Sequence, residues 1–105
     1  MINKVERDGR IAVLVSPGFG AGWSTWSDDE QRDLALFDPR LVAAAEANVS
    51  DIDDLVKEVF GDVNFYTGGW HQVEVRWVNK GDSFSIEEYD GSESMRSISD
   101  LTITA

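Results

Sequence analysis

Five consecutive apolar residues at positions 11–15 constrain the fold of this chain more than any other stretch. A strand that is apolar at every position has two faces to bury, so it belongs in the interior with cover on both sides. Asp8 and Gly9 directly before it form a two-residue turn signal, which predicts a hairpin between residues 2–7 and 10–16. The first arm is polar and is expected at an edge. Pro17 ends the second arm because proline cannot donate to a strand ladder.

Two or three helices are expected in the middle of the chain, where three start signals are present. Residues 27–30 have the form of a capping box ahead of a short helix. Asp38-Pro39 places an aspartate cap before a proline at the first helical position, and Asn48 is the expected stop of that helix. Ser50 is expected to cap a third helix that Gly61 ends. Apolar residues recur along it at helical spacing, and they are Ile52, Leu55, Val56, Val59 and Phe60.

The last third of the chain changes to a period of two. Residues 73–77 alternate between apolar and polar, which predicts a strand with one buried face. A turn at residues 79–82 leads into residues 83–86, where the alternation is repeated on the way back. Residues 89–92 form another turn signal, and residues 101–105 suggest a last short strand.

The order of these elements predicts a single α+β domain over residues 1–105. Consecutive strands joined by tight turns favour antiparallel pairing. We therefore expect an antiparallel sheet of four to five strands, built from a β-hairpin, two or three helices and a β-meander, with the helices packed on one face.

Charge is the strongest global signal. Twenty acidic residues oppose nine lysines and arginines, which gives a formal net charge of −11. This balance disfavours direct binding to nucleic acid or to an anionic membrane, because phosphate contacts need clustered cations. It favours a partner with a basic surface, or a surface that imitates nucleic acid. The alternative is that the acidity serves only solubility.

Cysteine is absent, which excludes disulfides and thiolate metal sites and agrees with a reducing compartment. The start of the chain has no apolar segment typical of a signal peptide, and the longest apolar runs are strand-sized. The expected location is therefore the cytoplasm, with no membrane association.

The segment at residues 16–26 is the first candidate for a functional site. It carries glycines at positions 18, 20 and 22, followed by Trp23 and Trp26. A dinucleotide fingerprint would need its third glycine where Trp23 stands, and no phosphate-binding lysine follows. The acidic capping box also occupies the helix start that a phosphate would use. No cofactor is expected here.

A second aromatic group lies at residues 65–71. Exposed aromatic residues on a glycine-rich frame are typical of binding hot spots, whereas in a small sheet the same rings form the core. On the first interpretation, the candidate contact surface consists of Phe19, Gly20, Gly22, Trp23, Trp26, Gly69, Trp70, His71, Tyr89 and Asp90.

Catalytic patterns are weak in this sequence. His71 is the only histidine, and no Gly-x-Ser-x-Gly elbow is present. The acidic clusters do not match the spacing of a calcium loop, and Glu87 and Glu88 would point to opposite faces of a strand. We therefore expect no catalytic, cofactor-binding or metal-ligating residue and no enzymatic activity. A small hydrolase that uses a carboxylate with His71 is the weakest alternative.

Four segments together resemble a group of small acidic proteins encoded by phages and prophages. They are residues 13–26 (VLVSPGFGAGWSTW), 36–39 (LFDP), 66–69 (YTGG) and 86–94 (IEEYDGSES). The resemblance implies a setting in the cytoplasm of an infected or lysogenic bacterium. It implies no mechanism, and it assigns no catalytic residue to this chain.

The leading hypothesis is an accessory protein that binds a host or defence protein, as an inhibitor or as a nucleic-acid mimic. The alternative is a protein that binds or sequesters a nucleotide-like small molecule. That alternative requires Arg10, Arg76 or Lys80 to converge on a pocket, because the acidic chain otherwise repels phosphate. Homo-oligomerisation through exposed edge strands is left open by the sequence.

Overall fold

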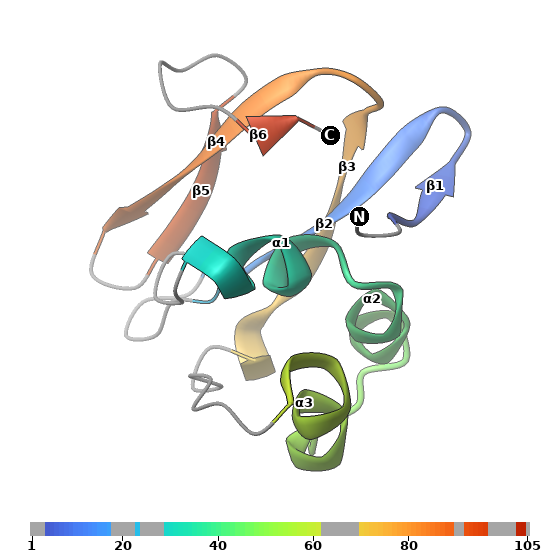
Figure 1. Ribbon diagram of the computed structural model, residues 1–105. Helices are drawn as coiled ribbons and strands as arrows, with labels where there is room; N and C mark the ends of the chain where they lie inside the picture. The colour runs from blue at the N-terminus through green and yellow to red at the C-terminus, as the bar shows by residue number, and fades with distance from the viewer. Residues whose placement is uncertain are drawn as a thin grey trace.

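The computed structural model describes residues 4–17, 23, 29–61, 70–89, 92–96 and 103–104. The described residues form an α+β fold with three α-helices and two antiparallel sheets of three strands each (Figure 1). No helix within the described ranges is long and apolar enough to cross a membrane.

The first sheet contains the predicted hairpin. Its strands are β1 (Glu6–Arg7), β2 (Arg10–Val15) and β3 (Glu74–Asn79), in the order β1-β2-β3. The hairpin turn has positive φ at both central residues, 53° at Asp8 and 75° at Gly9, as a tight two-residue turn requires. β2 is the central strand, and its five apolar residues are all buried, which confirms the prediction of cover on both faces.

The second sheet differs from the expected meander. Its strands are β4 (Ser83–Tyr89), β5 (Ser92–Arg96) and β6 (Ile103–Thr104), in the order β5-β4-β6. β4 pairs with β5 and β6, whereas β3 pairs with β2. The turn after Asn79 therefore takes the chain out of the first sheet, and a single sheet of four to five strands is not confirmed.

The two faces of β2 explain this division, because each face has its own apolar cover. Ala12 and Leu14 belong to the first hydrophobic cluster, which includes buried residues of α2 (Pro39–Glu46) and α3 (Asp53–Phe60). Ile11, Val13 and Val15 belong to the second cluster, with Phe84 of β4 and the end of α1 (Asp29–Phe37). A β4 strand paired beside β3 would leave this second face without the part of its apolar cover that Phe84 supplies.

Local signals set the helix boundaries as expected in most places. Asp38 caps α2 by accepting a hydrogen bond from the backbone N–H of Arg40 at 2.9 Å. Asn48, just past the end of α2, has the predicted left-handed conformation with φ of 56°. Gly61 ends α3 with φ of 77°. Within the stripe of α3, Ile52, Val56 and Val59 are buried and the other two members are partly buried.

The predicted cap of α3 is wrong. The helix begins at Asp53 with Ile52 in the cap position, so Ser50 lies before it. The Asp51 carboxylate accepts the backbone N–H of Asp53 at 3.1 Å. Asp51 thus satisfies a backbone N–H at the start of α3, which is the role expected of Ser50.

The two ends of the described chain are joined near α1. The Lys4 ammonium donates to the carbonyl of Thr104 in β6 at 2.9 Å. The same ammonium lies 4.5 Å from the centre of the Phe37 ring. The N-terminal hairpin and the last strand are therefore tied to one apolar cluster.

Candidate functional site

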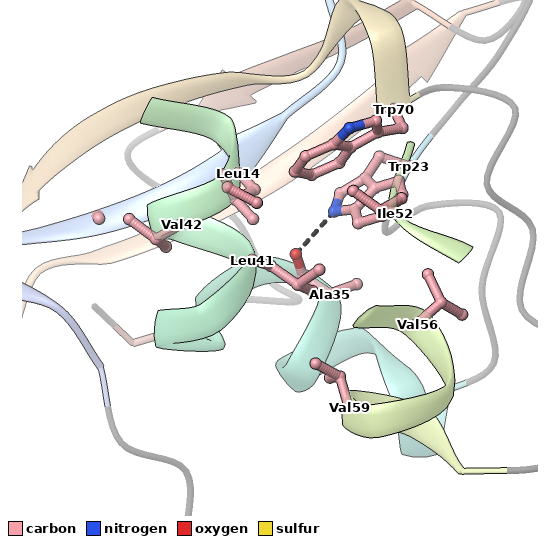
Figure 2. Close-up of a cluster of buried hydrophobic side chains, with 11 residues drawn as sticks. Leu14, Trp23, Ala35, Leu41, Val42, Ile52, Val56, Val59 and Trp70 are labelled. Atoms are coloured by element: carbon pink, nitrogen blue, oxygen red, sulfur yellow. Dashed lines mark hydrogen bonds between the residues drawn. The ribbon is translucent and has the colours of Figure 1, made fainter. Parts of the chain in front are cut away.

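Two of the predicted contact residues, Trp23 and Trp70, pack against each other inside the first hydrophobic cluster. Their ring centroids are 5.4 Å apart with an interplanar angle of 49° (Figure 2). The Trp23 indole N–H donates to the carbonyl of Ala35 at 2.7 Å, and that of Trp70 donates to the carbonyl of Val49 at 2.7 Å. Both polar atoms are therefore satisfied within the chain.

Burial removes these two indoles from the expected contact surface. Trp23 has 0% and Trp70 has 7% of its surface exposed, so neither offers a face to a partner. The physical reason is that a large ring with one satisfied donor is more stable in a small apolar core than in water. Trp23 and Trp70, one from each aromatic segment, do lie together, but in the core.

The other members of the candidate surface are only partly described. His71 lies in a single 3₁₀ turn (Trp70–Gln72) and Tyr89 ends β4, and their side chains lie outside the described part of the structure. The remaining candidates, also outside the described residues, are Phe19, Gly20, Gly22, Trp26, Gly69 and Asp90.

Glu93 in β5 is a buried carboxylate that binds Ser16 and Trp23, the residues before and after the glycines at positions 18, 20 and 22. Only 2% of its surface is exposed. One carboxylate oxygen accepts the backbone N–H of Ser16 at 2.9 Å, and the other accepts the backbone N–H of Trp23 at 2.8 Å. The Glu93 backbone N–H also donates to the carbonyl of Ser16 at 2.8 Å. One residue of the second sheet thus fixes where the segment leaves β2 and where it enters the core.

The sequence did not identify this role. Glu93 lies in an acidic cluster with Glu87, Glu88 and Asp90, a composition typical of a solvated surface. The amide groups that it binds are 77 and 70 positions away along the chain. No local pattern reports a partnership over such a distance.

The start of α3 presents carboxylates to solvent. Asp51, Asp53 and Asp54 are exposed, and within the described part of the chain none of them forms an ion pair. The apolar stripe of the helix faces the core, so these side chains point away from it. They form the acidic start of α3, a name kept below for these three residues.

Most described cations, by contrast, are paired within the chain. Arg7 contacts Glu46 with both ends of its guanidinium, at 2.6 and 2.9 Å. Arg40 lies 3.1 Å from the buried Asp38 carboxylate. In each case the hydrogen bond to the carboxylate is the main reason why the pKa of the guanidinium is raised above its ordinary value. Both guanidiniums thus keep their charge, and both are paired with carboxylates of the same chain.

An open hollow of about 490 Å³ lies at the turn end of the first sheet, lined by Arg7, Asp8, Arg10 and Trp77. The Arg7 guanidinium carbon is 5.3 Å from the centre of the Trp77 ring, so it covers part of the indole. Arg10 is exposed and forms no ion pair with any described residue. Of the three cations that the sequence offers for a phosphate site, Arg10 alone lines this hollow.

The other two cations are engaged elsewhere. Arg76 is 2.7 Å from Glu74, and Lys80 is 2.9 Å from Glu6. Within the described ranges, no three histidine or acidic side chains are grouped so as to hold a metal ion. Comparison with protein-family models, with curated proteins and with solved structures finds no match to this chain.

Proposed function

We propose that this chain is a small acidic accessory protein of a phage or prophage that binds a basic host or defence protein in the bacterial cytoplasm. The main support is a contrast in charge pairing among the described residues. Most of their cations are paired with carboxylates of the same chain, whereas the acidic start of α3 is unpaired. The phage setting is supported by the sequence resemblance alone.

The charge contrast supports a protein partner for a physical reason. Carboxylates that are already paired within a chain are poor ligands, because a partner would have to displace the internal cation. Among the described residues the acidic start of α3 has no such competitor, and its helix packs its other face into the core. A basic partner therefore meets free charges on a fixed support, which favours fast association and correct orientation.

The burial of Trp23 and Trp70 moves the proposed contact away from the two indoles. With both rings inside, the described surface that remains is polar and acidic rather than aromatic. Its only exposed large apolar residue among those described is Val49, two positions before Asp51. An acidic helix start beside one apolar side chain suits a basic surface with a small apolar centre.

The test is affinity capture with charge-matched variants. The chain is immobilised and exposed to nuclease-treated bacterial lysate at about 150 mM salt, where exposed charges act over only ~8 Å. Asp53→Asn/Asp54→Asn removes two charges from the acidic start of α3 while keeping the size of each side chain. Two exposed ion pairs at ~0.2–1 kcal/mol each predict a loss of about two- to thirtyfold in affinity.

Asp8→Asn/Asp82→Asn is the control, because it removes the same charge at the turn between β1 and β2 and at the turn between β3 and β4, both far from α3 (Figure 1). Asparagine also suits the left-handed conformation of residue 8. The control should retain the captured protein. Equal retention by both variants, or capture only below about 50 mM salt, would contradict the proposal. Displacement by duplex DNA or RNA would favour a nucleic-acid mimic.

The hollow at the turn end of the first sheet favours the second candidate function, binding of a nucleotide-like molecule. Arg10 supplies a free guanidinium for a phosphate, and Trp77 supplies an indole beside it. A thermal-shift screen of nucleotides tests this function. Stabilisation should disappear in Arg10→Gln and persist in Arg76→Gln, whose guanidinium is paired with Glu74. Absence of any shift in the unmodified protein would remove this candidate.

A further inference from the structure

Among the described strands, β3 lies at an edge of the first sheet, and its side away from β2 is called the open edge below. It pairs with β2 along its whole length, from Glu74 opposite Val15 to Asn79 opposite Arg10. None of the described strands pairs with its other edge. Natural edge strands are commonly shortened, bulged or interrupted by proline, and β1 at the opposite edge has only two residues. β3 has six residues, no proline and an unbroken register.

The hydrogen-bond pattern shows which groups this open edge presents. The backbone N–H of Lys80 donates to the carbonyl of Gly9 at 2.9 Å, so this pair is a hydrogen-bonded one. Hydrogen-bonded and non-hydrogen-bonded pairs alternate in an antiparallel ladder. Glu74, Arg76 and Val78 therefore direct their backbone groups to β2. The alternate residues, including Val75 and Trp77, direct theirs to the open edge.

We propose that a second copy of this chain pairs antiparallel along the open edge of β3, with Val75 of each copy opposite Val75 of the other. The two first sheets then form one continuous sheet of six strands. Both residues of the central pair have outward backbone groups, so two reciprocal hydrogen bonds form at the two-fold axis. Trp77 lies opposite Val73 on each side of that axis, and both belong to the partly buried border of the first cluster.

Charge selects this register. With Val75 at the axis, Glu74 of one copy lies opposite Arg76 of the other, and the pair occurs twice. A shift by two residues in either direction places Glu74 opposite Glu74 or Arg76 opposite Arg76, and like charges at opposed positions are destabilising. About half of each side chain is exposed, and they already lie 2.7 Å apart within one chain. Pairing thus creates an alternating array of two carboxylates and two guanidiniums.

The acidity of the chain also favours this edge over other surfaces for self-association. Two copies with a net charge of −11 repel each other. Between Asp62 and Asp82, however, Glu74 is the only acidic residue, and Arg76 and Lys80 lie in the same stretch. The copies therefore approach through a stretch of sequence that has more cations than carboxylates.

Charge reversal tests the proposal by sedimentation equilibrium from about 1 µM to 1 mM protein, the range of weak specific association. Glu74→Arg and Arg76→Glu each place like charges opposite one another and should weaken dimerisation by about tenfold or more. An equimolar mixture of the two variants should form heterodimers, and the double exchange Glu74→Arg/Arg76→Glu should restore homodimers. Asp33→Arg on α1 is the control for Glu74→Arg, because it makes the same charge change away from β3. It should leave dimerisation unchanged.

Backbone hydrogen exchange provides a second readout that needs no substitution. Protection of the Val75 and Trp77 amides should rise with protein concentration, while the Arg76 and Val78 amides stay protected throughout. A chain that is monomeric at every concentration would overturn the proposal, as would dimers that neither single variant weakens. A double exchange that fails to dimerise would also overturn it, since a shift of four residues would place Glu74 opposite Lys80.

Discussion

Replacing Glu93 with glutamine should destabilise the fold strongly. The Glu93 carboxylate accepts two backbone N–H groups, from Ser16 at 2.9 Å and from Trp23 at 2.8 Å, and it is nearly fully buried. Glutamine has almost the same shape but only one oxygen. Its amide NH₂ would therefore face one of the two N–H groups, so a donor would oppose a donor.

The magnitude follows from the lost bond. A hydrogen bond to a charged group contributes about 1.5–3 kcal/mol, and an unsatisfied buried amide costs a similar amount when its partner is removed. These are two descriptions of one loss, so we expect the free energy of unfolding to fall by about 2–3 kcal/mol. For a domain of this size, each kcal/mol lowers the melting temperature by roughly 4–8 °C, which predicts a decrease of more than about 8 °C.

Urea denaturation followed by tryptophan fluorescence measures this change, because Trp23 and Trp70 both lie in the core. Glu58→Gln is the matched control, since it makes the same chemical change at an exposed carboxylate in a surface ion pair. The control should alter the free energy of unfolding by less than about 1 kcal/mol. A Glu93→Gln variant as stable as the control would refute the role assigned to this carboxylate.

Substitutions at three further positions test the packing and the helix boundaries, each by thermal denaturation. Trp23→Ala should cost about 3–5 kcal/mol, because it leaves a cavity in the first cluster and removes the hydrogen bond to Ala35; a loss below about 1 kcal/mol would contradict the burial. Asp38→Ala should cost about 0.5–2 kcal/mol through the lost cap of α2, and Asp38→Asn, which keeps an acceptor for the Arg40 amide, should cost less. Gly61→Ala should cost about 1–2 kcal/mol from backbone strain alone, since φ is 77° and an added Cβ meets no atom within 4 Å; an unchanged melting temperature would refute that strain.

Local features of this fold are predictable from the sequence because their causes are local. The turn at Asp8 and Gly9, the cap at Asp38 and the apolar stripe of α3 each depend on residues a few positions apart. The burial of all five apolar residues of β2 follows from their uninterrupted succession in the sequence. Ser50 failed as a cap because neighbouring Asp51 serves the same amide, a competition between adjacent residues that residue type does not resolve.

The strands with which β4 pairs were not predictable in the same way. An alternating strand after a tight turn is compatible with pairing back along β3 or with crossing to the other face of β2. The second face of β2 decides between them, because Ile11, Val13 and Val15 need apolar cover that Phe84 provides. That requirement is set by the whole fold and is not visible in residues 79–86.

The candidate site shows the same limit. Tryptophan has both an apolar surface and a polar donor, so residue type does not distinguish a core ring from a binding ring. The carbonyls of Ala35 and Val49 decide the question for Trp23 and Trp70, because each accepts an indole N–H inside the protein. The contact surface proposed here therefore rests on the acidic start of α3 instead of on these rings.

Chemical-shift mapping on the isotope-labelled chain tests this central claim most directly, once a partner has been captured. Titration with the partner should shift the backbone amide signals of Asp51, Asp53 and Asp54 and leave the indole N–H signals of Trp23 and Trp70 in place. The reverse pattern, with the two indole signals shifted and the start of α3 unchanged, would contradict it.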